Sequence, residues 1–319
     1  MGALKRVLVL GLLLAAVVVP ADAVTNGIIA YPWKDATGAQ QIFTINSAGT
    51  GRQQITFGNH NGMPWWSPTG TQLAGTVVFF DSSCQCNRAG IAVMNSDGSN
   101  WHLIAVDATA PSWSSTNKIA FTTNRDGTGD NIWAMNSDGS NQQQITTHAV
   151  GIGYSSPGWS PDGAHLVFVV SAAGPPDGAV HNQLWTMNAD GSNQMQITFP
   201  GLNNNLDCSG NVINAATDAN GRSWSINGKI VFWSGVENTF GQVWTANSDG
   251  SRRKQLTCSP APINNDDPMW SPDGRKMTFS TNRNGPAEMW TMNADGTNQR
   301  RVTSLAVGPF PGNASWQPK

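Results

Sequence analysis

Hydrophobic and polar positions recur along the chain in a fixed arrangement around a short polar turn. The turn has six copies: Asn46–Gly49, Asn95–Gly98, Asn136–Gly139, Asn188–Gly191, Asn247–Gly250 and Asn293–Gly296. Six residues before each Gly stand Phe43, Ala92, Trp133, Trp185, Trp244 and Trp290, and six residues after it stand Ile55, Ile104, Ile145, Ile197, Leu256 and Val302. Thr follows that aliphatic residue in five copies, and Ala105 is the exception. Spacing kept on both sides of a turn predicts two strands joined by a tight hairpin.

A second series of large residues interleaves with the first. It consists of Trp66, Trp113, Trp159, Trp224, Trp270 and Trp316, and three of these open a Trp-Ser-Pro-x-Gly motif. An alternating apolar stretch follows, such as Leu166 and Phe168 after Trp159. Each unit therefore predicts four short strands, and four-stranded units repeated at this period are typical of β-propeller blades.

The two ends of the chain indicate how the propeller closes. The first predicted strand, Ile28 to Tyr31, lacks a preceding Trp strand, whereas the chain finishes on a lone Trp strand around Trp316. Joining them completes one blade from both termini and leaves no open sheet edge. The sequence thus predicts an all-β fold: a six-bladed propeller of four-stranded antiparallel blades, closed by N- and C-terminal strands that share one blade.

Composition agrees with an all-β chain and narrows the kinds of partner. Glu occurs only twice, at Glu237 and Glu288, which argues against helices because Glu is a usual filler of exposed helical faces. The net charge is −2, and only 12% of the residues are charged. A nucleic-acid-binding surface needs a basic field, so no nucleic-acid partner is expected.

The first 23 residues have the three parts of a secretory signal peptide. Lys5 and Arg6 form a basic start, Val7 to Val19 an apolar stretch, and Ala21-Asp22-Ala23 a small-residue cleavage site. The apolar stretch is too short to span a bilayer, which needs about 20 residues. We therefore expect residues 1–23 to be removed and residues 24–319 to form a single exported propeller domain, periplasmic or extracellular, without a membrane span and monomeric.

The repeat resembles a known family. Trp270-Ser-Pro-Asp-Gly274, Trp290-Thr-Met-Asn-Ala-Asp-Gly296 and Val302-Thr303 are similar to the WD40-like PD40 repeats of the TolB family. The resemblance covers about residues 26 to 318, and not the mixed α/β domain that TolB itself carries ahead of its propeller. It implies a six-bladed propeller, often extracytoplasmic in bacteria, that serves mainly as a protein-interaction surface.

One face of the predicted propeller carries most of the length variation. The second-to-third loops and the blade-to-blade connections share this face, here called the long-loop face. Its longest segments are Phe80 to Gly90, Ser171 to Asn182, Phe199 to Gly221 and Ser259 to Asp267. Variable loops on a rigid scaffold usually carry function. The candidate binding residues there are His60, His148, His181, Asp207, Asp218, Asp266, Asp267, Phe80, Phe199 and Phe240.

The four cysteines lie on the same face. Export would permit disulfides, and four cysteines allow three pairings. We expect Cys208 to pair with Cys258, because both are placed on the long-loop face of neighbouring blades, and Cys84 to pair with Cys86. A zinc site is the weaker interpretation, since the cysteine spacing matches no common zinc motif.

The sequence favours binding over catalysis. It contains neither a Gly-x-Ser-x-Gly elbow nor a phosphate-binding loop. We therefore expect a non-catalytic protein without a cofactor, which binds a protein or glycan through the long-loop face. The alternative is a metal-dependent polysaccharide lyase or hydrolase using His60, His148 and His181. It has precedent by resemblance, because some pectate-degrading lyases with TolB-like propellers use a histidine-bound metal, although these histidines have no ligand spacing.

Overall fold

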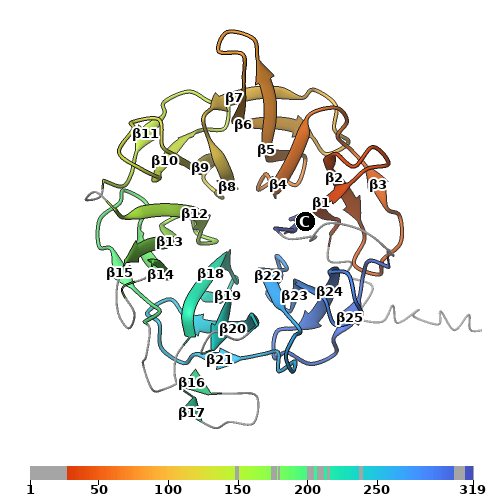
Figure 1. The fold of residues 1–319 in the computed structure, drawn as a ribbon, viewed down its shortest axis with the longest axis vertical. Helices are drawn as coiled ribbons and strands as arrows, with labels where there is room; N and C mark the ends of the chain where they lie inside the picture. The colour runs from red at the N-terminus through yellow and green to blue at the C-terminus, as the bar shows by residue number, and fades with distance from the viewer. Residues whose placement is uncertain are drawn as a thin grey trace, which may run out of the picture.

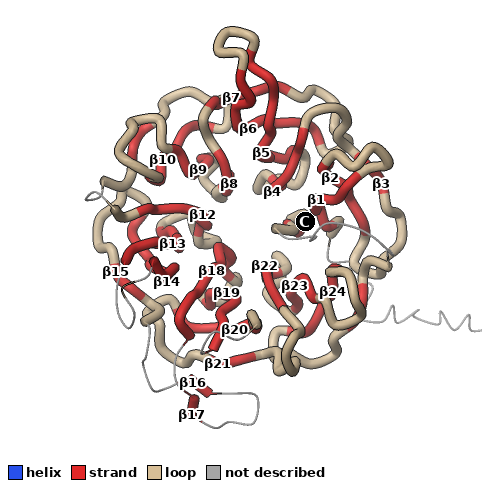
Figure 2. The backbone as a smooth tube through the Cα atoms, in the orientation of Figure 1, coloured by secondary structure: helices blue, strands red, loops and turns tan. Residues whose placement is uncertain are grey.

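A computed structural model describes residues 27–147, 151–173, 178, 180–199, 205–206, 212–213, 216–236, 240–304 and 313–318. Six sheets surround a central axis in these residues, and each sheet forms one blade (Figures 1 and 2). This arrangement confirms the predicted six-bladed propeller of four-stranded antiparallel blades. No helix among the described residues is long and apolar enough to cross a membrane.

The blades follow one another along the chain, and each runs from an inner strand to an outer strand. Blade 1 contains β26 (Ser315–Trp316), β1 (Ile29–Lys34), β2 (Gln40–Ile45) and β3 (Gln53–Gln54). Blade 2 contains β4 (His60–Trp66), β5 (Gln72–Asp81), β6 (Cys86–Asn95) and β7 (His102–Val106). Blade 3 contains β8 (Thr109–Trp113), β9 (Lys118–Thr123), β10 (Asn131–Asn136) and β11 (Gln143–Gln144).

The second half of the molecule repeats the plan, with one addition. Blade 4 contains β12 (Gly153–Trp159), β13 (His165–Ala173), β14 (Val180–Asn188) and β15 (Met195–Gln196). Blade 5 contains β18 (Ala216–Trp224), β19 (Lys229–Val236), β20 (Gln242–Asn247) and β21 (Lys254–Gln255). Two short strands, β16 (Asn205–Leu206) and β17 (Val212–Ile213), extend blade 5 beyond β21. Blade 6 contains β22 (Asn265–Trp270), β23 (Lys276–Thr281), β24 (Glu288–Asn293) and β25 (Arg300–Arg301).

The ring closes in blade 1, as expected from the two ends of the chain. β26 pairs antiparallel with β1, with Trp316 opposite Ile29 and Ser315 opposite Ala30. The neighbouring blade also holds β26, because the Trp66 indole N–H donates to the Ser315 carbonyl at 3.1 Å. The last strand is therefore bonded on both sides.

The hydrophobic core is distributed between neighbouring blades. One cluster joins Ala74 and Ile91 of blade 2 to Trp113 and Phe121 of blade 3, and the other clusters follow the same plan. Trp66, Trp113, Trp159, Trp270 and Trp316 are all buried. The Trp columns of the sequence thus pack between blades, where large apolar rings contribute most to stability.

The polar turns between third and fourth strands also join blades. At Gly98 the backbone has φ +85°, and a Cβ there would lie only 1.8 Å from the Ile55 carbonyl oxygen of blade 1. The same close approach recurs at other blade junctions, for example between Gly250 and the Ile197 carbonyl. Glycine is required because this backbone conformation and this contact both exclude a side chain.

A buried threonine follows the outer strand in five blades, and its hydroxyl bonds to the third strand of the same blade. We call this contact the Thr latch. In blade 5 the Thr257 hydroxyl accepts a hydrogen bond from Val243 N–H (2.9 Å) and donates to Gln242 Oε1 (2.8 Å). Thr56, Thr146, Thr198 and Thr303 accept the equivalent N–H bond in their own blades. Each of these five blades has an outer strand of two residues next to the third strand.

Blade 2 lacks the Thr latch. Ala105 stands at the position of the latch threonine, and Gly90 stands at the position that Gln242 has in blade 5. The outer strand β7 runs for five residues. Pairing continues past its end, because Asp107 N–H donates to the Ala89 carbonyl at 2.7 Å. Ala105, the exception in the sequence repeat, therefore coincides with a longer outer strand in the structure.

Candidate binding cleft on the long-loop face

The hairpin of β5 and β6 joins the second and third strands of blade 2, so it belongs to the long-loop face. Each strand has ten residues, compared with six in the matching strands of blades 3 and 6, so the hairpin projects beyond the disc (Figure 1). Its turn is closed by a disulfide between Cys84 and Cys86. The segment expected to be a loop from Phe80 to Gly90 is thus mostly paired strand. Phe80 and Val78 of β5 are 60% and 40% exposed.

A cleft of about 520 Å³ lies between this hairpin and blade 3. Blade 2 lines it with the disulfide, Asn87, Arg88 and Asp107, and blade 3 lines it with Thr109, Thr122, Thr123, Asn124 and Asp130. Most of these side chains are hydrogen-bonding groups. Clefts that combine a rigid frame with a few convergent polar groups are the usual ligand sites of proteins.

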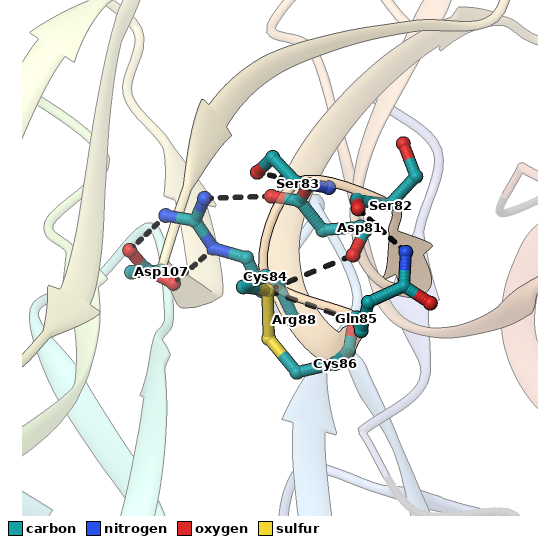
Figure 3. The surroundings of a disulfide bond; sticks show 8 residues. All are labelled: Asp81, Ser82, Ser83, Cys84, Gln85, Cys86, Arg88 and Asp107. Carbon is teal, nitrogen blue, oxygen red and sulfur yellow. Dashed lines mark hydrogen bonds and ion pairs between the residues drawn. A yellow bond between two sulfur atoms is a disulfide. The ribbon is translucent and has the colours of Figure 1, made fainter.

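Arg88 is the electrostatic centre of the cleft. Its Nη1 donates to Asp81 Oδ2 at 2.9 Å, its Nε donates to Asp107 Oδ1 at 2.9 Å, and its Nη2 donates to Asp107 Oδ2 (Figure 3). The Ser83 hydroxyl, and then Arg88, hold the pKa of Asp81 down to about 2. Arg88 likewise lowers the pKa of Asp107. Both carboxylates are therefore ionised at neutral pH. Their charged hydrogen bonds fix the orientation of the Arg88 guanidinium.

The missing Thr latch explains how Asp107 reaches this cleft. Because β7 continues to pair with β6 as far as the Asp107 N–H bond to Ala89, the Asp107 side chain is brought beside Arg88 on the neighbouring strand. On the blade 3 side, the Thr123 hydroxyl donates to the Asp107 carbonyl. One sequence exception, at Ala105, thereby builds one wall of the cleft.

The three aromatic candidates lie at separate places. Phe80 is exposed on the projecting hairpin, and Phe240 is 39% exposed two residues before β20, the third strand of blade 5. Phe199 is only half-exposed, because the Arg253 guanidinium lies over its ring at 5.8 Å. Of the three, Phe80 is the one that pairs with a residue of the cleft, Asn87.

The histidine candidates are not brought together by the described residues. His60 is exposed at the start of β4, whereas His181 is buried in β14, two blades away. His148 lies outside the described residues, as does Asp207, and the side chain of Asp218 in β18 is likewise outside them. No group of three His, Cys, Asp or Glu residues that could hold a metal is found within the described part of the chain.

Asp266 and Asp267 lie on the inner strand of blade 6. The Asp266 carboxyl is packed against Gly241, where a Cβ would lie 2.4 Å from Oδ1. Burial, and then repulsion from Asp267, raise the pKa of Asp266 to about 7. Asp267 has φ +47° at a β-bulge, and Met63, Ala110 and Ser156 repeat this backbone in the inner strands of blades 2, 3 and 4. These two acids do not line the cleft.

The second cysteine pair is described in part. Cys258 follows the Thr latch of blade 5 and is disulfide-bonded. Cys208, its expected partner, lies outside the described residues.

Sequence reasoning missed Arg88, Asp107, Asn124 and Asp130. The signal that could have found the cleft is Ala105, because the loss of the repeated Thr at one blade predicts a different strand ending there. The identity of the groups across the cleft depends on blade-to-blade geometry, which the repeat spacing alone does not contain.

Comparisons with known proteins identify the fold. No protein-family model matches the chain, and no curated protein matches it. Among solved structures, TolB from Acinetobacter baumannii superposes with a TM-score of 0.70 at 17% identity, over 92% of this chain and 67% of that chain. A putative TolB from Agrobacterium tumefaciens gives a TM-score of 0.65 at 17% identity, over 91% and 93%.

A further solved structure, an oligogalacturonate lyase in complex with manganese, is similar at a TM-score of 0.52 and 14% identity, over 79% of this chain and 71% of that chain. Likeness at this level of identity concerns the fold and not the activity. The chain therefore has the TolB-like six-bladed β-propeller fold.

Proposed function

We propose that this protein is an exported binding module that holds a protein or glycan partner on its long-loop face, with the cleft between blades 2 and 3 as the main contact. The observation that carries this proposal is the cleft itself, lined by polar groups from two blades beside a disulfide-closed hairpin. Arg88 is held in place by two carboxylates, so it can contact a ligand without first being ordered. Export rests on the signal-peptide pattern of residues 1–23.

The exposed aromatic residue that pairs with Asn87 of the cleft supports the same conclusion. Phe80 is 60% exposed on a hairpin whose strands are fully paired, so the ring is presented on a rigid element. Rigid aromatic side chains surrounded by polar groups are typical anchors of binding interfaces.

Site-specific photo-crosslinking tests the location. A benzoylphenylalanine at exposed Asn124 is placed at the cleft, and the matched control at exposed Asp138 is placed on the third-to-fourth turn of the same blade. We expect a discrete adduct from native extracts with Asn124→benzoylphenylalanine only, and its loss when Arg88→Ala is added. An equal adduct from both positions would refute the assignment to the cleft. Parallel glycan-array binding of the parent and Arg88→Ala proteins separates a glycan partner from a protein partner.

The lyase alternative is tested on the same purified protein. Its support is the fold shared with the manganese-bound lyase. Stoichiometric metal that is lost on His148→Ala, together with cleavage of pectate, would replace the binding proposal by the enzyme. Unchanged metal content in His148→Ala and intact pectate are the results that we expect.

A further inference from the structure

A second, smaller cavity lies at the rim between blades 1 and 2, separate from the cleft. Its volume is about 320 Å³, and two aromatic rings line it, Phe57 after β3 and Trp101 before β7. Phe57 is 75% exposed and Trp101 is 40% exposed. Leaving two large apolar side chains in water beside an open cavity is costly, which points to an occupant.

The repeat shows what normally fills this place. Trp101 is the third residue after the turn glycine, and the same position in the other blades holds Arg52, Gln142, Gln194, Arg253 and Gln299. Trp101 is thus the aromatic exception among polar residues. Likewise, Phe57 follows Thr56 as Phe199 follows Thr198 in blade 4.

The junction between blades 4 and 5 is the filled counterpart. There Gly250 lies against the Ile197 carbonyl just as Gly98 lies against the Ile55 carbonyl at the rim cavity. The Arg253 guanidinium covers the Phe199 ring at 5.8 Å, and its Nη2 donates to the Ile197 carbonyl at 2.9 Å. The Arg253 side chain therefore fills the space over the Phe199 ring, whereas the corresponding space beside Phe57 and Trp101 is the open rim cavity.

Guanidinium-on-ring contacts recur throughout this protein. Arg52 lies over Phe43 at 4.2 Å, and Arg283 lies over Trp290 at 4.6 Å. A cation over an aromatic face is attracted by the ring quadrupole, more strongly once it is desolvated. At the rim cavity, the described lining supplies two rings and the amides of Asn59 and Asn61, and includes no charged residue. The lining therefore offers ring faces and acceptors but no cation.

We propose that the rim cavity binds the side chain of an arginine from a partner protein, whose guanidinium contacts the rings of Phe57 and Trp101. The proposed contact between the two proteins is of the same kind as the contact that Arg253 makes with Phe199 within the chain. The proposal does not depend on the cleft, because the two sites share no residue.

Fluorine NMR of the full chain labelled with 5-fluorotryptophan tests the site. The probe is N-acetyl-arginine amide, and the Trp101 signal is assigned by its loss in Trp101→Phe. We expect a saturable shift of this signal with millimolar affinity. The affinity for the neutral isostere N-acetyl-citrulline amide should be lower by a factor of about five or more, because this probe lacks the charge that the rings attract.

Three variants make the test selective. Phe57→Ala should weaken arginine binding severalfold, whereas Phe80→Ala, which removes an exposed ring elsewhere, should leave it unchanged. Trp101→Arg supplies the chain's own guanidinium, so its melting temperature should equal or exceed that of the parent. Equal affinity for arginine and citrulline overturns the proposal, as does a Trp101 signal that no arginine shifts. A response of Trp101 to a methyl glycoside alone would assign the cavity to a sugar instead.

Discussion

At the scale of single residues, Asp266 is the clearest source of pH dependence. Its carboxyl is largely buried beside another acid, which raises its pKa to about 7 in the folded protein, compared with about 3.9 in an unfolded chain. A raised pKa means that the folded state binds the proton more tightly. The contribution of Asp266 to stability is therefore complete below about pH 4 and is lost as the pH rises through about 7.

Replacing Asp266 by Asn should remove the loss of stability at high pH. We expect Asp266→Asn to be more stable than the parent at pH 8, by up to about 4 kcal/mol, and to differ little from it at pH 4. Urea unfolding at the two pH values measures the difference. Asp249→Asn serves as a control of opposite sign, because a hydrogen bond from Ser251 lowers the pKa of this turn residue. An Asp266→Asn protein that keeps the pH slope of its parent would contradict this explanation.

The sequence predicts some residues well because their role is repeated. The Trp columns recur in register with the strands, and their packing between blades could be inferred from that register alone. Arg88 and Trp101 occur once each, so no repeat identifies them. Their roles depend on which side chain of the next blade faces them, and that is a property of the assembled ring.

At the scale of elements, the Thr latch sets where each outer strand ends. In blade 5 Thr257 satisfies two buried groups at once, the Val243 N–H and Gln242 Oε1. Without a latch, β7 continues and carries Asp107 to Arg88. A short outer strand also limits the free edge that a second molecule could pair with.

Thr257→Val tests the latch. The two side chains have the same shape, but valine leaves a buried N–H without its acceptor, which costs about 1 to 3 kcal/mol. We expect the free energy of unfolding to fall by that amount in urea denaturation. Thr147→Val, at an exposed threonine, is the matched control and should change stability by less than about 0.5 kcal/mol. A neutral Thr257→Val would mean that the latch bonds add nothing to stability.

The number and order of strands could be predicted from the repeat, whereas their lengths could not. Beyond Val78, the residues of β5 pair only with β6, so the length of the hairpin depends on the two strands matching each other. The sequence suggested a loop there because the segment from Phe80 to Gly90 carries extra length relative to other blades, and extra length is usually found in loops.

At the scale of the whole molecule, closure depends on the last strand. Ser315 and Trp316 are buried, and Gln317 adds a hydrogen bond from its N–H to the Ile28 carbonyl at 2.8 Å. Truncation before Asn313 should remove β26, expose the inner edge of β1 and lower the melting temperature by about 10 °C, as expected for losing a buried Trp. Differential scanning calorimetry measures the shift, and removal of Lys319 alone is the control. A truncated protein that melts like the parent would refute the shared blade.

The seam in blade 1 also has a mechanical consequence. β1 meets β26 through two residue pairs but meets β2 through six. A pulling force applied between Gly27 and Pro318 loads the shorter pairing directly, and blades 2 to 6 bear tension only after it has parted. Under such a load the ring would open into an arc of intact blades at low force, and it would unravel blade by blade only at higher force.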